Sequence, residues 1–327
     1  ITRRETALLG ERLIKRQEVS RMALPSPRRR WAVPASSLAR RPKESITSIK
    51  TMIECPLAWA LKYGAGIRPG GLHVLPDDEQ LVGILAHAVV ESLFAQRKDW
   101  DADDAAREAV TLFDSLATKT AAPLLRLGYA VEYQRAKTRV SESIRLLVSM
   151  ISASGLKVRG CEEEMTAAFA SDQYFNGYLD LALQDAEGRS VVLDLKWSKR
   201  DKYRREEIAE GRALQLAAYS WLEEQAGRKS LGAGYFMLRQ QSLLFTSPHP
   251  FSSASYVPGS DLTKTWGELR RAYDHRMVQL ENGGIVVRGV AAGPEDDDQD
   301  PMPQVEPGCK FCDYRPLCGA SVKEGRA

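Results

Sequence analysis

Two aspartates and a lysine within residues 175–198 have the types and spacing of a hydrolytic metal site. Apolar residues alternate with the others on both sides of a turn at residues 186–188, which is the period of two β-strands. Gly188 suits the left-handed position that ends a three-residue hairpin loop. The first strand carries Asp180, and the second carries Asp194 and Lys196.

The turn also predicts the register of this hairpin. Pairing of Asp185 with Arg189 places Asp180 opposite Asp194. Opposite residues of an antiparallel pair have Cβ atoms roughly 4.5–5.5 Å apart. Two carboxylates at that distance repel each other, so we expect a hard divalent cation such as Mg²⁺ between them, with Lys196 on the same face. The alternative is a pair of solvated aspartates on an outer face; the apolar runs around the strands favour the metal site.

Composition limits the class of protein. The chain has 327 residues, of which 43% are hydrophobic and 27% charged, enough for a core in one large domain or two. The net charge of +3 does not by itself indicate nucleic-acid binding. No apolar run approaches the roughly 20 residues that span a bilayer, and no signal peptide is recognisable, so we expect a cytoplasmic protein without membrane contact. Because it starts at Ile1, we expect a piece of a longer protein.

Basic residues gather in three places. One group lies near the start of the chain and consists of Arg28, Arg29, Arg30, Arg40 and Arg41. A second group follows Lys196 and consists of Lys199, Arg200, Lys202, Arg204 and Arg205. Residues 199–205 are expected to contact a nucleic-acid backbone. Arg126, Arg135 and Arg139 could line a nucleic-acid channel, with solvated surface charges as the alternative.

Three of the five cysteines lie close together near the end of the chain, as Cys309-x2-Cys312-x5-Cys318. This spacing in a chain without secretion signals favours a metal site over disulfides. Four thiolates hold either a tetrahedral zinc or an iron–sulfur cluster, so a fourth ligand is needed. Cys55 is favoured because Pro56 should bend the chain there, whereas Cys161 falls within a strand and is expected to be a small core residue.

The remaining pattern predicts an α/β protein with one sheet flanked by helices. Expected helices cover residues 1–24, 45–64 with a break at Cys55, 79–96, 101–118, 121–153, 206–225 and 261–282. Expected strands cover 157–169, the hairpin, 232–238 and 242–246. Residues 25–43 are expected to be irregular, and 283–307 to be a mobile, acidic connection. Gln215 and Tyr219 are four apart and share one face of their helix.

Taken together, these motifs resemble the RecB-like branch of the PD-(D/E)XK nucleases, and in particular its iron–sulfur members. These members include the nuclease domain of the AddB subunit of helicase–nucleases and CRISPR-associated iron–sulfur nucleases. The matching residues are Cys55 in IECPLAW, His87 in GILAHAVVESLF, Asp180 in GYLD, Asp194 and Lys196 in DLK, Gln215 and Tyr219 in QLAAY, and the three late cysteines. Their order and spacing carry the resemblance, which covers residues 55–318. Asp194 stands where many members have glutamate.

The resemblance implies a restriction-endonuclease-like core, a central mixed β-sheet with a helical N-terminal part. It says nothing about residues 1–44, a basic arm that could contact DNA or a partner protein, with a solvated tail as the alternative. Residues 45–327 would form one nuclease domain. A [4Fe–4S] cluster on Cys55, Cys309, Cys312 and Cys318 would join its ends.

The resemblance also implies the ligands and the catalytic residues. Asp180, Asp194, the Leu195 carbonyl and His87 would hold Mg²⁺ or Mn²⁺, and Lys196 would act on the attacking water. Gln215 and Tyr219 would contact DNA or support the lysine. A supporting glutamate would be one of Glu162, Glu163 and Glu164, with no basis for a choice.

The expected activity is therefore that of a metal-dependent deoxyribonuclease, more specifically an exonuclease acting on single strands or duplex ends. It would work with, or be fused to, a helicase in DNA repair, recombination or defence. Two alternatives remain. One is an inactive nuclease fold that binds DNA as a scaffold, and the other is a zinc-containing protein of unrelated function.

Overall fold

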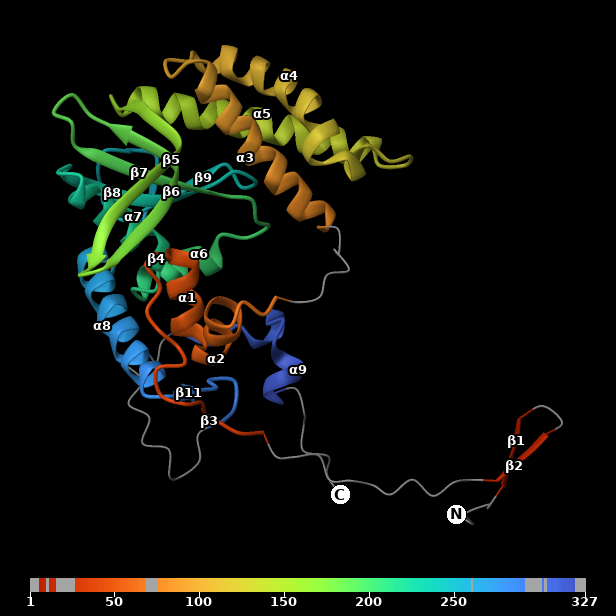
Figure 1. Ribbon diagram of the computed structural model, residues 1–327. Coiled ribbons are helices and arrows are strands. Elements are labelled where there is room, and N and C mark those ends of the chain that lie inside the picture. Colours follow the sequence, from red (N-terminus) through yellow and green to blue (C-terminus); the bar gives the residue numbers. More distant parts are fainter. Residues whose placement is uncertain are drawn as a thin grey trace.

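The computed structural model describes residues 6–9, 12–15, 27–68, 76–259, 261–291, 302 and 305–320. Helices cover both faces of a central mixed sheet (Figure 1), which confirms the predicted α/β core. No helix in the described part is both long and apolar enough to cross a membrane.

The central sheet has seven strands. In spatial order they are β10 (Ser255–Tyr256), β9 (Ser242–Phe245), β8 (Ser230–Met237), β7 (Ser190–Lys196), β6 (Gln173–Gln184) and β4 (Lys43–Ser45), with β5 (Lys157–Ala170) also paired to β6. Strand β6 runs antiparallel to β5 and β7, and β7 runs parallel to β8. The predicted hairpin β6–β7 thus lies in the middle of the sheet.

Two hydrophobic cores enclose this sheet. Helices α3 (Asp78–Gln96), α4 (Ala102–Thr120) and α5 (Ala130–Ala153) form one core with Leu181 and Leu193. Helices α1 (Ile46–Glu54), α7 (Leu214–Gln225) and α8 (Leu262–Glu281) form the other with Ala182 and Val192. Since successive strand residues point to opposite faces, the hairpin is buried on both sides. This excludes the solvated outer face that the sequence left open.

The chain before the sheet bends where it was predicted to bend. Ser45 caps α1 in a reciprocal capping box with Ser48. Cys55 then ends α1 in an extended conformation, and Pro56 opens α2 (Pro56–Trp59), followed by the π-turn η1 (Ala60–Gly64). A proline at the first helical position needs no N–H partner, so the break leaves the Cys55 side chain at a corner.

Several predicted boundaries are wrong. The helix expected over 206–225 is two helices, α6 (Lys202–Ala209) and α7, because Gly211 adopts a φ of +64° between them. The helix expected over 1–24 is absent where that segment is described, and β1 (Thr6–Leu9) and β2 (Arg12–Lys15) form an antiparallel pair there. The long helix α5 begins only after a short 3-10 turn, η2 (Ala122–Leu125).

Two segments expected to be irregular contribute to a small second sheet. Strand β3 (Arg30–Ala32) pairs with β11 (Gly284–Val286), directly after α8. The acidic run at residues 295–300 lies outside the described residues. The chain then continues into η3 (Cys309–Phe311) and α9 (Arg315–Cys318), which lie close to α1 and α2 (Figure 1).

Candidate active site and cysteine site

The predicted register of the hairpin is confirmed over its paired residues. The ladder runs from Gln184 opposite Ser190 to Leu181 opposite Leu193, and the Asp185 N–H donates to the Arg189 carbonyl at 3.1 Å. Asp180 and Asp194 are the next residues of this register, beyond the last ladder pair. At this position the Asp180 side chain takes the place of a backbone acceptor, because its Oδ2 accepts the Leu195 N–H at 2.7 Å.

Asp194 is fully buried, and its carboxylate lacks well-directed hydrogen-bond donors among the described residues. Its side chain is 0% exposed, and neither carboxylate oxygen has a well-directed hydrogen bond. Its charge partner is Lys196, whose Nζ lies 2.5 Å from Oδ2. Burial raises the pKa of Asp194 to about 6 even though the Lys196 charge lowers it. A buried carboxylate without hydrogen bonds is the arrangement expected beside a cation.

Three potential metal ligands converge next to this pair. One ligand atom each of His87, Glu162 and Asp180 lies within 4.8 Å of the others, the one such group found among the described residues. The oxygens of Asp194 lie outside this group. The three residues come from α3, β5 and β6, so distant parts of the chain meet there. Carboxylate and imidazole donors together suit Mg²⁺ or Mn²⁺ better than a soft metal.

The structure selects Glu162 from the three adjacent glutamates of β5. Cys161 and Glu163 pair with β6 on either side, while Glu162 has a φ of +48° and leaves the ladder opposite Asp180. A positive φ is uncommon for a residue other than glycine, and such local strain concentrates at functional sites. Burial raises the pKa of Glu162, and it raises the pKa of Asp180 to about 6. Without a metal, both carboxyl groups therefore keep their protons to a higher pH than free carboxyl groups do.

His87 is the imidazole member of this group. Its Nδ1 lies 3.8 Å from Asp180 Oδ2. Burial lowers the pKa of His87 and the nearby Lys196 charge lowers it further, while Asp194 and the Leu195 carbonyl act in the opposite direction. The neutral imidazole is therefore favoured, and this is the form that binds metals.

Helix α7 brings Gln215 and Tyr219 to the same centre, as their spacing indicated. The Gln215 side-chain amide donates to the Tyr219 hydroxyl at 2.9 Å. Burial and the charge of Asp194 raise the pKa of Tyr219, which places its phenol in the field of that carboxylate. Gly177 on β6 permits this approach, because a Cβ there would lie 2.6 Å from Leu222 Cδ1 and 3.2 Å from the Tyr219 ring.

Arg204, one of the basic residues expected to contact a nucleic-acid backbone, is mostly buried, with 25% of its side chain exposed. It lies in α6, its Nη1 bonds Glu207 Oε2 at 2.5 Å, and its guanidinium stands 5.2 Å from the centre of the Tyr235 ring. Tyr235 is the residue of β8 paired with Asp194, and the Arg204 charge lowers the pKa of Asp194. The sheet thus has a second cation close to Asp194, in addition to Lys196.

Three of the other basic residues after Lys196 also form ion pairs within the chain. Lys199 pairs with Glu79 at 3.5 Å, Lys202 with Glu206 at 3.7 Å and Arg205 with Asp201 at 3.1 Å. These pairs are solvent-exposed and weak, so they leave the predicted backbone contact untested.

The four cysteines selected from the sequence lie around one cavity. Cys55, Cys309, Cys312 and Cys318 line one cavity of about 550 Å³, and all are free thiols. Burial raises the pKa of Cys309, and the other three cysteines raise it further through charge repulsion. The four sulfurs are not among the groups whose ligand atoms lie within 4.8 Å of one another. Their spacing is therefore wider than around a single ion in this structure.

The remaining cysteine, Cys161, is not part of this cavity. Its thiol donates to the Asp180 carbonyl at 2.9 Å, and burial raises its pKa to about 12. It packs against the core beneath α3, as expected for a small buried residue.

Comparison with known proteins gives the family. No curated protein matches the chain significantly. Among solved structures, one described as the crystal structure of SSO0001 is 12% identical and aligns over 88% of this chain and 90% of its own, with a TM-score of 0.33, too low to support an argument. The family model described as "PD-(D/E)XK nuclease superfamily" matches residues 43–319, from the first strand of the sheet to the last cysteine. The chain therefore belongs to the PD-(D/E)XK nuclease superfamily.

Proposed function

We propose that the protein is a metal-dependent DNA nuclease of the RecB-like branch, an exonuclease that works with or is fused to a helicase in repair, recombination or defence. The observation that supports it best is the buried Asp194–Lys196 pair beside the converging ligands His87, Glu162 and Asp180. A purely structural sheet would not place three carboxylates and a lysine in one buried centre, because their desolvation costs several kcal/mol per charge.

Each residue has a role in hydrolysis. Asp180, Glu162 and His87 would hold Mg²⁺ or Mn²⁺, with Asp194 and the Leu195 carbonyl facing the same centre. The ion would lower the pKa of a bound water and offset charge on the phosphate. Lys196 orients the attacking water and neutralises phosphate charge, and Asp194 holds its ammonium in place.

Digestion of end-labelled single-stranded and duplex DNA with Mg²⁺ or Mn²⁺ tests this function. Lys196→Ala and Asp194→Ala should lower the cleavage rate by about a thousandfold or more while DNA binding persists. Lys264→Ala is the matched control, because that lysine lies on α8 and its side chain is 71% exposed. Full activity of either active-site variant, or an inactive wild type with bound metal, would reject the assignment. Resistance of circular DNA would distinguish an exonuclease from an endonuclease.

We further propose that the cysteine cavity holds a [4Fe–4S] cluster that joins the two ends of the nuclease domain. Cys55 precedes the sheet and the other three ligands follow it, so a cluster would cross-link about 250 residues of sequence. The close approach of Gly289, where a Cβ would lie 2.6 Å from Cys309 Sγ, leaves room for little but the thiol. Anaerobically purified protein should be brown and lose the colour in Cys309→Ala. Colourless protein with stoichiometric zinc would contradict the cluster.

A further inference from the structure

We propose that the groove between α3 and α5 guides a single strand of nucleic acid to the catalytic carboxylates. This inference rests on the proposed nuclease function and specifies the form of its substrate.

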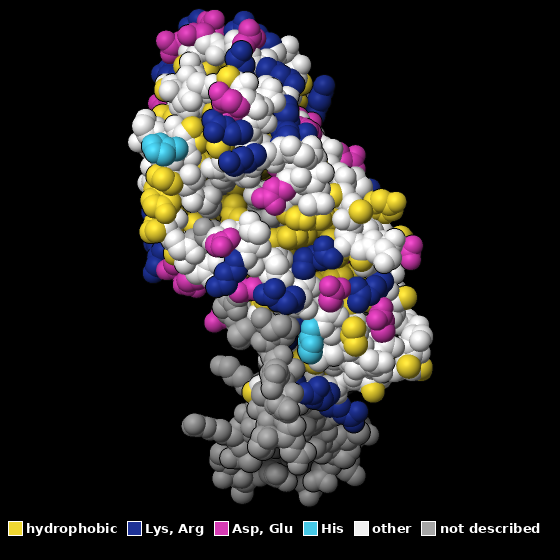
Figure 2. Space-filling view, turned by 90° about the vertical axis from the view of Figure 1, so that its left-hand side faces the viewer, with side chains coloured by type: hydrophobic (Ala, Val, Ile, Leu, Met, Phe, Trp, Pro, Cys, Tyr) yellow, Lys and Arg dark blue, Asp and Glu magenta, His cyan; other side chains and the backbone are white. Residues whose placement is uncertain are grey.

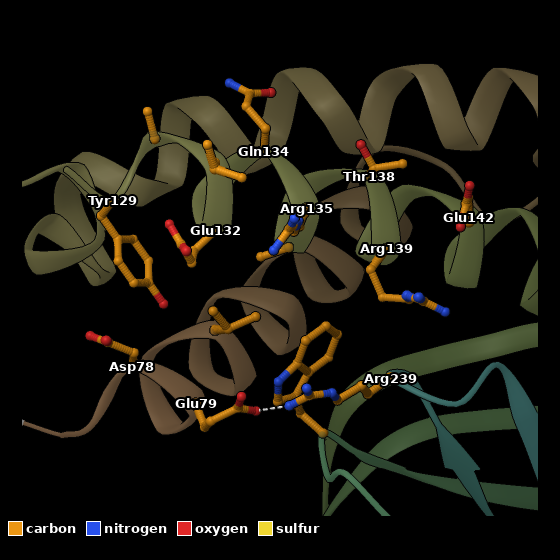
Figure 3. Close-up of a pocket in the computed structure, with 15 residues that line it drawn as sticks. Asp78, Glu79, Tyr129, Glu132, Gln134, Arg135, Thr138, Arg139, Glu142 and Arg239 are labelled. Atoms are coloured by element: carbon orange, nitrogen blue, oxygen red, sulfur yellow. Dashed lines mark hydrogen bonds and ion pairs between the residues drawn. The ribbon is translucent and has the colours of Figure 1, made fainter.

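The groove lies directly beside the active centre. It has a volume of about 980 Å³, and its walls are the start of α3, the first half of α5, Trp197 and Arg239 (Figure 3). Trp197 follows the catalytic Lys196 and packs against α3, where a Cβ on Gly83 would lie 3.3 Å from the Trp197 Cβ. Val82, also in the wall, precedes His87 by five residues, or about 7.5 Å along the helix axis. A strand in the groove therefore ends at the metal ligands.

Two arginines of the groove are free to meet phosphates. Arg135 and Arg139 lie one turn apart on α5 and are solvent-exposed, and Figure 3 shows both beside the groove opposite Arg239. Neither makes an ion pair within the described part of the chain. Arg126, the third arginine considered from the sequence, lies outside the lining and binds Asp78 through two contacts of 2.7 Å.

Three of the four acidic side chains in the lining already have a hydrogen-bond or ion-pair partner. Asp78 is bound by Arg126, Glu79 is bound by Arg239, and Glu142 accepts a hydrogen bond from Gln241 at 3.1 Å. Glu132, at the Tyr129 end, is left without such a partner in the described residues (Figure 3). Glu132 and Glu142 thus carry no paired cation, and Arg135 and Arg139 carry no paired anion in the described residues. A phosphate chain in the groove would have its contacts at this arginine pair.

The apolar part of the lining indicates a single strand rather than a duplex. The lining includes two aromatic side chains, Tyr129 and Trp197, and the apolar side chains of Val82, Val131 and Ala136. Unpaired bases stack on aromatic side chains and contact apolar ones, whereas a duplex hides its base faces and offers mainly phosphates. Elsewhere, on the face shown in Figure 2, basic and acidic side chains are interspersed, as on an ordinary solvated surface.

The test measures binding separately from cleavage. Fluorescence anisotropy of a labelled single strand and of a duplex of equal length is followed in EDTA at several salt concentrations. The double variant Arg135→Ala/Arg139→Ala should bind the single strand at least about tenfold more weakly, and its salt slope should shrink by about 1.4, since each phosphate contact to a single strand contributes about 0.7. Arg145→Ala is the matched control, because Arg145 lies on the same helix and pairs with Asp103 at 3.0 Å, outside the groove.

The outcomes separate this inference from the proposed function. Unchanged single-strand affinity and salt slope in the double variant, or a wild type that binds no single strand, would overturn the proposed role of the groove. This holds even if the wild type cleaves DNA. An equal loss of duplex affinity would overturn the choice of a single strand. A wild type that binds single strands through both arginines but cleaves nothing would support the groove and reject the nuclease.

Discussion

Substitution of Asp180 by asparagine tests the electrostatics of the metal centre without a substrate. Asp180 is buried, and burial raises its pKa from 3.8 to about 6 in the metal-free protein. Asparagine keeps an oxygen that can accept the Leu195 N–H, which now lies 2.7 Å from Oδ2, but it removes the charge. We expect Asp180→Asn to stabilise the metal-free protein at neutral pH.

The size and sign follow from the pKa shift. The folded pKa lies above the unfolded value, so folding favours the protonated acid, and stability falls as the pH rises from about 4 through 6. A shift of about 2 units corresponds to about 3 kcal/mol once the group is ionised in both states. About half of this penalty is present at pH 5. The stability gained by Asp180→Asn should therefore grow by about 1.5 kcal/mol between pH 5 and pH 8.

Chemical denaturation of both proteins in EDTA at several pH values measures this difference, and contributions from groups remote from Asp180 cancel. Mn²⁺ should raise the melting temperature of the wild type at pH 8 and change that of Asp180→Asn much less. Asp185→Asn is the control with opposite sign, because hydrogen bonds from Arg189 outweigh burial and lower the pKa of Asp185. A pH-independent difference between wild type and Asp180→Asn, or an equal response of both to Mn²⁺, would refute the reasoning.

Two further predictions concern the residues around this centre. Arg204→Ala should lower the cleavage rate at least tenfold and also destabilise the protein, because it leaves the buried Glu207 carboxylate without its ion-pair partner. Arg204→Lys should recover stability more than cleavage rate, since lysine lacks the planar guanidinium. Equal recovery of stability and rate would contradict a role of Arg204 at the site. Gly177→Ala should cost about 1–3 kcal/mol in a melting or denaturation experiment, because the new methyl group would overlap Leu222; a variant as stable and active as the wild type would show that α7 can move away freely.

The local part of this site was predictable from the sequence. The register of β6 and β7 followed from a turn of fixed length and a period of two, and the ladder from Gln184 to Leu181 confirms it. The bend at Cys55 followed from Pro56 in the same way. Such features depend on neighbouring residues alone, so propensity and sterics decide them.

Features that depend on tertiary packing were missed. Nothing in the run Glu162–Glu164 distinguishes the residue that leaves the ladder, because the positive φ of Glu162 opposite Asp180 is visible only in the folded sheet. The arginine of α6 looked like one more charge in a basic loop until Tyr235 and Glu207 were placed around it. A positive φ needed at Gly211 was a weak but readable signal for the break before α7.

The same short helix also connects the two sites. Tyr203 of α6 lines the cysteine cavity, while its neighbour Arg204 lies over Tyr235 beside Asp194. Glu54, one residue before Cys55, lines that cavity too, and burial raises its pKa while the charge of Glu207 raises it further. A displacement of α6 at the cavity would therefore move the Arg204 guanidinium relative to Asp194. The segments that carry Cys55 and the three late cysteines thus contact the helix that places a cation beside the hairpin where hydrolysis is proposed to occur.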